Sequence, residues 1–210
     1  MLLTCRAKNL GPSRRTEREV IGMRFTCAVL LVCVFVAGAA FAQMEAMKPA
    51  PELKKLDYFA GNWTSVADVK PGPMGKGGKT TIHEHLEWME GKFFLVNHGK
   101  YSGADGSGNE IAFLGYDPQE KVYTYDEFNS QGEAVHAKGT VDGDTWTWGN
   151  EMKMGDKTMK TRFTEKVLSP TEYTYKFELS PDGTNWNSIM DGKATKVAGA
   201  KAAAKPEAKP

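Results

Sequence analysis

Hydrophobic and polar residues alternate along most of the chain between residues 63 and 194, in stretches rich in β-branched and aromatic residues. A period of two is typical of β-strands whose two faces lie in different surroundings. Turn residues such as Asp142-Gly143 separate most of these stretches, so successive strands are expected to pair antiparallel. The alternation predicts these strands: Trp63–Val69, Thr80–Glu90, Lys92–Ser102, Glu110–Tyr116, Lys121–Phe128, Glu133–Val141, Thr145–Met152, Met159–Val167, Glu172–Leu179 and Asn185–Ala194.

The predicted fold is all-β, a single antiparallel up-and-down β-barrel of about ten strands, because closing the sheet leaves no strand edge exposed. No amphipathic helix of the length that a parallel crossover needs interrupts the strands. A short amphipathic segment, Leu53–Ala60, precedes the first strand and is expected to form a short N-terminal helical lead-in.

Two motifs lie within this predicted unit: Leu53–Trp63, which ends in Gly61-Asn62-Trp63, and Ile111–Asp117, which is followed by Tyr123. Together they resemble a family of bacterial exported proteins, a domain of unknown function with a lipocalin-like (calycin) fold. The resemblance covers almost the whole predicted barrel. It implies a barrel and no established activity, so it carries over no catalytic residue.

The same resemblance assigns closure residues to one end of the barrel. In lipocalin-like barrels the Trp of the opening Gly-x-Trp fills the closed end, and the Gly lets the chain turn into the first strand. A cation often covers this Trp. We therefore expect Gly61 and Trp63 to close the barrel, with Arg162 or Lys193 over the indole ring.

A leader precedes the predicted barrel. Met23-Arg24, an apolar run over residues 28–37 and Ala40-Phe41-Ala42 together indicate a secretory signal peptide. We therefore expect export, to a bacterial periplasm or as a secreted protein. The expected organisation is an upstream extension before the true start (1–22), the signal peptide (23–42), a linker (43–51), the barrel (52–197) and an Ala/Lys/Pro-rich tail (198–210).

Removal of the leader changes the composition. All three cysteines precede Gln43, so the exported form has no disulfide and no thiolate nucleophile. The leader also takes six basic and two acidic residues from totals of 27 and 26, which leaves a net charge near −3. This balance, with no basic cluster among aromatic residues, argues against nucleic-acid binding. No second hydrophobic run is long enough to span a membrane.

Aromatic residues recur two positions apart on three predicted strands. If these faces point inward, they line a cavity suited to a small hydrophobic or amphipathic ligand. The alternative is that they fill the barrel, which then acts through its outer surface as a protein-interaction or envelope module. The candidate ligand-binding residues are Tyr123, Tyr125, Trp146, Trp148, Tyr173 and Tyr175.

Histidines give a second alternative, a periplasmic zinc-binding barrel. His83 and His85 share one strand face, and His136 on another strand is a candidate third ligand. The opposite face of the first strand carries Ile82 and Leu86, which favours an outward direction for both histidines.

Catalytic motifs are missing from the sequence: it contains no G-x-S-x-G elbow, H-E-x-x-H helix or phosphate-binding loop. We expect no enzyme activity. Haem-binding nitrobindin-type barrels extend the Gly-x-Trp opening differently, and no histidine follows His136 here. We therefore expect no cofactor, and a small apolar or amphipathic molecule as the partner.

Overall fold

The computed structural model describes residues 48–72 and 75–198. The expected upstream extension, the signal peptide and nearly all of the expected tail lie outside the described residues. Among the described residues, no helix has the length and apolar character needed to cross a membrane. The elements are a 3₁₀ helix, η1 (Pro51–Tyr58), and the strands β1 (Gly61–Val69), β2 (Gly78–Trp88), β3 (Leu95–Gly103), β4 (Gly106–Asp117), β5 (Val122–Asn129), β6 (Ala134–Asp142), β7 (Thr145–Met154), β8 (Lys157–Ser169), β9 (Glu172–Ser180) and β10 (Asn187–Val197).

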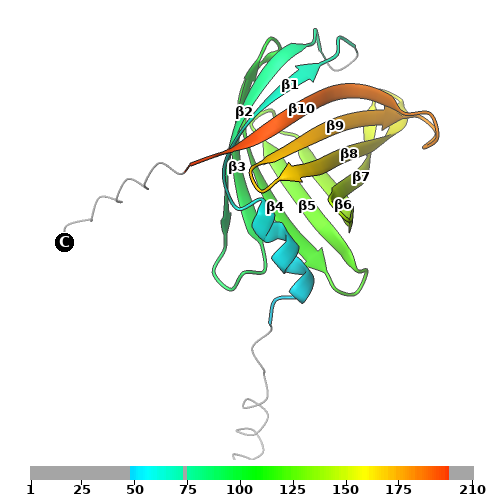
Figure 1. Ribbon diagram of the computed structural model, residues 1–210. Coiled ribbons are helices and arrows are strands. Elements are labelled where there is room, and N and C mark those ends of the chain that lie inside the picture. The colour runs from blue at the N-terminus through cyan, green and yellow to red at the C-terminus, as the bar shows by residue number, and fades with distance from the viewer. Residues whose placement is uncertain (1–47, 73–74, 199–210) are drawn as a thin grey trace, which may run out of the picture. The chain divides into compact units, whose positions relative to one another are not determined.

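The ten strands form a closed barrel in which each strand pairs antiparallel with its neighbours in sequence (Figure 1). Pairing of β1 with β10 completes the closure, in a register that sets Asn62 opposite Val197. The predicted all-β, up-and-down barrel is therefore confirmed. The lipocalin-like description also holds, because every strand is joined to the next by a turn or short loop.

The connection between β2 and β3 is longer than predicted. These strands were expected to run to Glu90 and to begin at Lys92, but they end at Trp88 and begin at Leu95. The connection is a wider turn, in which the Met89 N–H donates a hydrogen bond to the Phe94 carbonyl at 3.0 Å. Elsewhere the boundaries lie within a few residues of the predicted ones.

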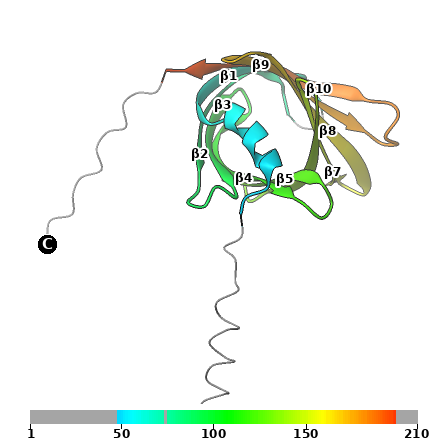
Figure 2. The same ribbon diagram turned by 60° about the horizontal axis from the view of Figure 1, so that its bottom comes forward.

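Helix η1 lies across one end of the barrel, as the end-on view shows (Figure 2). Its apolar residues Leu53 and Leu56 are buried against the barrel interior. Polar contacts fix the helix to the strands around it. The Tyr58 hydroxyl lies 3.0 Å from the Ser169 carbonyl and 2.9 Å from the Glu172 carbonyl, and Trp88 Nε1 donates to Asp57 Oδ1 at 2.8 Å. We call this the closed end of the barrel.

Trp63 is the centre of the closed end, as predicted from the opening motif. Its side chain is 1% exposed, and its indole N–H donates to the Phe59 carbonyl at 2.7 Å. The ring packs against Tyr173, with 5.0 Å between the ring centroids. Gly61 has a φ of +121°, a backbone conformation that side chains rarely adopt, so a glycine is needed where the chain turns into β1.

The cation over Trp63 is Lys196, and neither Arg162 nor Lys193 takes that position. Lys196 is the register partner of Trp63 on β10, and its Nζ lies 5.1 Å from the centre of the indole ring. Arg162 points outward, because it alternates with inward residues of β8. Its guanidinium lies 4.1 Å from the centre of the Trp186 ring and its Nε pairs with Glu178 at 2.8 Å. The prediction for Arg162 is therefore wrong.

Candidate ligand-binding site

The barrel interior contains a cavity of about 690 Å³. Phe59, beneath η1, lines its floor, and residues 133–135 and 151–153, at the other end of the strands, line its opposite limit. Glu133 and Lys153 there are exposed to solvent, so the cavity opens at the end away from the helix. A cavity of this size is in the range of small-molecule sites, which span about 300–1,000 Å³.

All six aromatic residues proposed from the sequence lie on the inner face of the barrel, but they divide into two groups. Tyr125, Trp148, Tyr173 and Tyr175 line the cavity. Tyr123 and Trp146 are buried below it, where their rings pack on each other at 4.7 Å between centroids. The Tyr123 hydroxyl donates to the Glu52 carbonyl of η1 at 2.9 Å. The barrel is thus filled at its closed end and hollow beyond it.

The position of Trp148 depends on a glycine on the neighbouring strand. Gly139 of β6 is the register partner of Trp148, and the indole ring lies over its backbone. Any Cβ atom at residue 139 would collide with the ring. In this position the indole N–H of Trp148 donates to Glu165 Oε2 at 2.9 Å. A polar group that faces the cavity is thereby held in one orientation.

Four glutamates on the inner face were not singled out from the sequence. Glu84 lies between the inward residues Ile82 and Leu86, and Glu127 lies two positions after Tyr125. The same alternation directs Glu110 and Glu165 inward. In the sequence, each of these glutamates lies two positions from a residue that points inward, so alternation places it on the inner face. A glutamate in a strand is nevertheless usually assigned to the solvent face. The four inward glutamates are Glu84 on β2, Glu110 on β4, Glu127 on β5 and Glu165 on β8.

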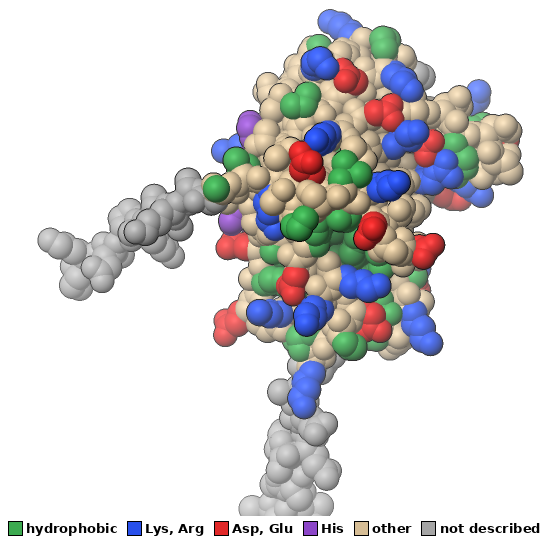
Figure 3. Space-filling view, viewed as in Figure 1, with side chains coloured by type: hydrophobic (Ala, Val, Ile, Leu, Met, Phe, Trp, Pro, Cys, Tyr) green, Lys and Arg blue, Asp and Glu red, His purple; other side chains and the backbone are tan. Residues whose placement is uncertain are grey.

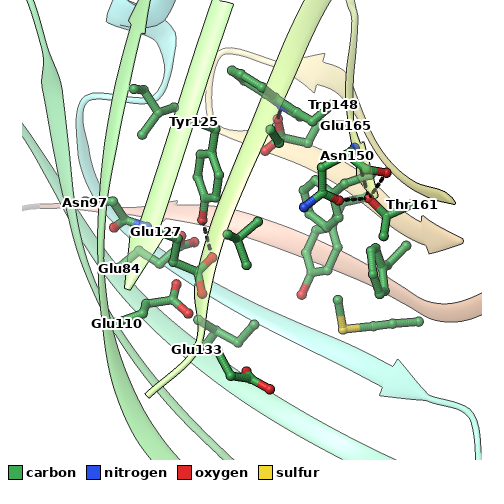
Figure 4. Close-up of a pocket in the computed structure, with 18 of the residues that line it drawn as sticks. Glu84, Asn97, Glu110, Tyr125, Glu127, Glu133, Trp148, Asn150, Thr161 and Glu165 are labelled. Carbon is green, nitrogen blue, oxygen red and sulfur yellow. Dashed lines mark hydrogen bonds between the residues drawn. The ribbon is translucent and has the colours of Figure 1, made fainter. Parts of the chain in front are cut away.

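Three of these glutamates and one asparagine cover the contiguous strands β2 to β5, and we call Glu84, Asn97, Glu110 and Glu127 the acidic wall. Figure 4 shows their side chains gathered at one side of the cavity, with Tyr125 pointing toward Glu127. Asn97 Nδ2 donates to Glu84 Oε1 at 2.8 Å, and the Tyr125 hydroxyl donates to Glu127 Oε2 at 2.7 Å. Asn97 is 3% exposed, and its Oδ1 atom has no hydrogen-bond partner among the described residues.

Burial raises the pKa values of the inward carboxyl groups. The pKa of Glu110 is raised to about 8, first by burial and then by the charges of Glu127 and Glu84. The pKa of Glu165 is raised to about 7 by burial, although the bond from Trp148 opposes the shift. Burial also raises the pKa values of Glu84 and Glu127. Within residues 48–72 and 75–198, no lysine, arginine or histidine forms an ion pair with any of the four.

The three candidate zinc ligands lie on the outer surface and are not brought together. His83 and His85 of β2 contact β1, where their Nδ1 atoms lie 3.0 Å from Thr64 Oγ1 and 2.8 Å from Asn62 Oδ1. His136 belongs to β6 and pairs with Asp126 at 2.7 Å. The described part of the chain contains no group of three or more His, Cys, Asp or Glu residues placed to hold a metal ion. The predicted zinc site therefore does not form, because three strands separate His136 on β6 from His83 and His85 on β2.

The outer surface differs from the interior in charge. On the face seen in Figure 3, acidic and basic side chains are interspersed over the barrel. The residues that line the cavity include six glutamates, of which Glu133 and Glu151 are exposed, and one lysine, Lys153, which is also exposed. The four inward glutamates thus give the cavity an excess of carboxyl groups that this face of the surface does not show.

The fold and the cavity define a lipocalin-like β-barrel with an internal site of ligand size. Residues 48–196 match the family model described as a protein of unknown function, DUF1579, and the chain belongs to this family.

Two solved structures give further comparisons. The crystal structure of Rv2717c from M. tuberculosis is 14% identical, with a TM-score of 0.50, and the match covers 72% of this chain and 100% of that chain. This likeness is one of fold. The structure of EF1p2_mFAP2b bound to DFHBI is 10% identical, with a TM-score of 0.39 and coverage of 69% and 98%. A comparison with curated proteins gave no match.

Proposed function

We propose that this protein binds a small apolar or amphipathic molecule inside its barrel. The observation that carries the proposal is the cavity of about 690 Å³, closed by η1 at one end and open at the other. A barrel that is solid throughout would have its aromatic residues packed on one another to both ends. Here the rings beyond Tyr123 and Trp146, such as Trp148 and Tyr175, still contact neighbouring aromatic rings, but they line the cavity and do not fill it.

The lining supports a ligand that is largely apolar. Leu86, Leu114, Phe163 and Phe177 contribute hydrocarbon surface, and the rings of Phe163 and Tyr175 lie 5.5 Å apart. Burial of apolar surface contributes about 25 cal/mol per Å², so a ligand of cavity size gains most of its affinity from these walls. The polar groups among them fix its orientation.

Uptake of the neutral fluorescent probe N-phenyl-1-naphthylamine tests the proposal. We expect saturable binding with one site, accompanied by a rise in probe fluorescence. Ala137→Phe places a ring in the cavity from β6 and is expected to weaken binding by about ten-fold or more, because the ring occupies ligand volume. Thr140→Phe on the exposed face of the same strand is the matched control and should bind as the unmodified protein does. No saturable uptake, or equal uptake by Ala137→Phe, would contradict the proposal.

Export to a periplasm or to the medium is part of the proposal, and it rests on the sequence of residues 23–42. We expect the protein recovered from the envelope or the medium of its host to begin at Gln43. N-terminal sequencing checks this, and recovery of a chain that keeps residues 23–42 in the cytoplasmic fraction would refute it.

A further inference from the structure

The acidic wall has many hydrogen-bond acceptors and few donors. Its three carboxyl groups and the Asn97 carbonyl offer seven oxygen atoms on four neighbouring strands. Among the described side chains, the donors that reach them are Asn97 Nδ2 and the Tyr125 hydroxyl. No hydrogen bond reaches the Glu110 carboxyl group within the described residues. A ligand that satisfies this wall must therefore supply donors.

Asn97 is an independent indication of the same requirement. Its Nδ2 atom donates to Glu84 Oε1, which leaves the Oδ1 atom on the other side of the amide group. The Oδ1 atom is consequently held as an acceptor, buried and without a partner. A buried polar atom left unsatisfied costs about 1–3 kcal/mol, so a donor from a bound molecule would recover that free energy.

The number of carboxyl groups at the wall favours a cationic donor. Buried carboxylates are costly unless a proton or a positive charge accompanies them. The described chain supplies no such charge at the acidic wall, since Lys153 is exposed at the open end. A metal ion is disfavoured, because no three candidate ligands within residues 48–72 and 75–198 are placed to hold one. An organic cation satisfies both the charge and the unfilled acceptors.

The opposite side of the cavity indicates the chemical character of the rest of the ligand. Phe163, Tyr175, Phe177 and Met190 of β8 to β10 present aromatic and thioether groups there. Such a surface suits an apolar body, and the faces of the aromatic rings also attract a nearby cation. The cavity therefore has a polar side and an apolar side.

We propose that the cavity takes an amphipathic organic ammonium ion, whose N–H groups donate to the acidic wall and whose apolar body lies against β8 to β10. This inference rests on the proposed ligand-binding function and specifies its chemical class. The pKa of Glu110, raised to about 8, supports it, because this group holds a proton in the free barrel at neutral pH and loses it to the solvent when a cation binds.

Three probes with one apolar body test the inference: 4-phenylbutylamine, 4-phenylbutanol and 4-phenylbutyrate. Their dissociation constants are measured by displacement of N-phenyl-1-naphthylamine and by calorimetry. We expect the amine to bind about ten-fold or more tightly than the alcohol, as charge-assisted hydrogen bonds allow, and the carboxylate to bind most weakly. Equal affinity for amine and alcohol, or a preference for the carboxylate, would overturn the inference.

Conservative variants assign the preference to the acidic wall. Glu110→Gln combined with Glu127→Gln keeps the side-chain shapes, so on this variant the amine should bind with near the affinity of the alcohol. Glu87→Gln, on β2 beside Glu84 but exposed on the outer face, is the matched control and should keep the full amine preference. An amine preference that survives the double variant would place its source elsewhere and refute the assignment.

The pH profile gives a second readout, since the amine stays protonated while the wall titrates. Amine affinity should rise between about pH 6 and pH 9. Protons should be released on binding, so that the binding enthalpy measured by calorimetry depends on the ionisation enthalpy of the buffer. The other titratable groups that line the cavity are Tyr125 of β5, Glu133 before β6, Glu151 and Lys153 of β7, Glu165 of β8, and Tyr173 and Tyr175 of β9. An amine affinity that falls over this range would contradict the inference.

These results separate the two proposals. If N-phenyl-1-naphthylamine binds and the amine shows no preference, the barrel is a ligand-binding protein and the cationic inference is wrong. If neither the naphthylamine nor any phenylbutyl probe binds, the proposed function itself fails.

Discussion

Replacing Trp63 with alanine is expected to lower the free energy of unfolding by about 3–5 kcal/mol, the usual cost of removing a large buried aromatic side chain. Trp63 is 1% exposed and packs on Tyr58 and Tyr173, with 5.5 Å and 5.0 Å between the ring centroids. The substitution also removes the hydrogen bond to Phe59 and the ring beneath Lys196. For a domain of this size the melting temperature should fall by about 10 °C.

Trp186→Ala is the matched control for this prediction. Trp186 is partly exposed in the connection between β9 and β10, where its ring contacts Arg162 and its Nε1 bonds to the Gly183 carbonyl at 3.1 Å. We expect a loss of about 1 kcal/mol for this variant. Thermal and urea unfolding measure both variants. Similar losses for the two would show that Trp63 is not the centre of the closed end.

The ligand-free barrel should become less stable as the pH rises from about 5 to 9, by an amount on the order of 3 kcal/mol. The pKa of Glu110 is raised from 4.5 to about 8 and that of Glu165 to about 7, chiefly by burial. Between the ordinary and the raised pKa, the folded state therefore binds more protons than the unfolded state. Stability is fully present below the ordinary pKa and is lost as the pH passes the raised one.

The groups around Glu110 and Glu165 favour the same loss of stability with rising pH. Glu84 and Glu127 have raised pKa values, and their charges act on Glu110. Tyr125 and Tyr175 also face the cavity, but their pKa values are raised, so they stay neutral over the range.

Glu110→Gln replaces the protonated acid with a neutral group of the same shape. At pH 9 the free energy of unfolding of this variant should be about 2 kcal/mol higher than that of the unmodified protein. The gain is limited because water at the open end screens part of the carboxylate charge. At pH 5 the two proteins should be equally stable. Glu87→Gln, on the outer face, should follow the unmodified protein at both pH values. Urea unfolding across the range provides the test. Stability that increases with pH would show that the inward carboxyl groups are not held in their protonated form.

The barrel was predictable because a period of two and the turn residues both act locally. Each strand is specified by a few consecutive residues, and short connections leave antiparallel neighbours as the simple arrangement. The same alternation set the aromatic residues of each strand on one face, and the structure shows that Tyr125 and Trp148 point inward. The boundary between the filled and hollow parts did not, because it depends on how far η1 and Trp63 reach into the barrel.

Two site features could not be obtained from alternation alone. Lys196 meets Trp63 through the register between the first and last strands, which are separated by most of the chain. The acidic wall arises because Glu84, Glu110 and Glu127, each isolated in the sequence, share parity with apolar residues on adjacent strands. The alternation alone indicates that each of these glutamates points to the same face as its apolar neighbours. Their meeting required the relative shift of four strands, which is set by the closed barrel as a whole.

Pairing of Asn62 with Val197 has a practical consequence for fusing or immobilising the protein through its C-terminal side. Both the first and the last strand reach the end that η1 covers, so a fusion partner joined after Val197 starts from the side away from the cavity opening. Immobilisation on a sensor surface through that terminus should leave the entrance free for small molecules. A barrel that binds amines as proposed would then serve, on such a surface, as a sensor for amines in solution.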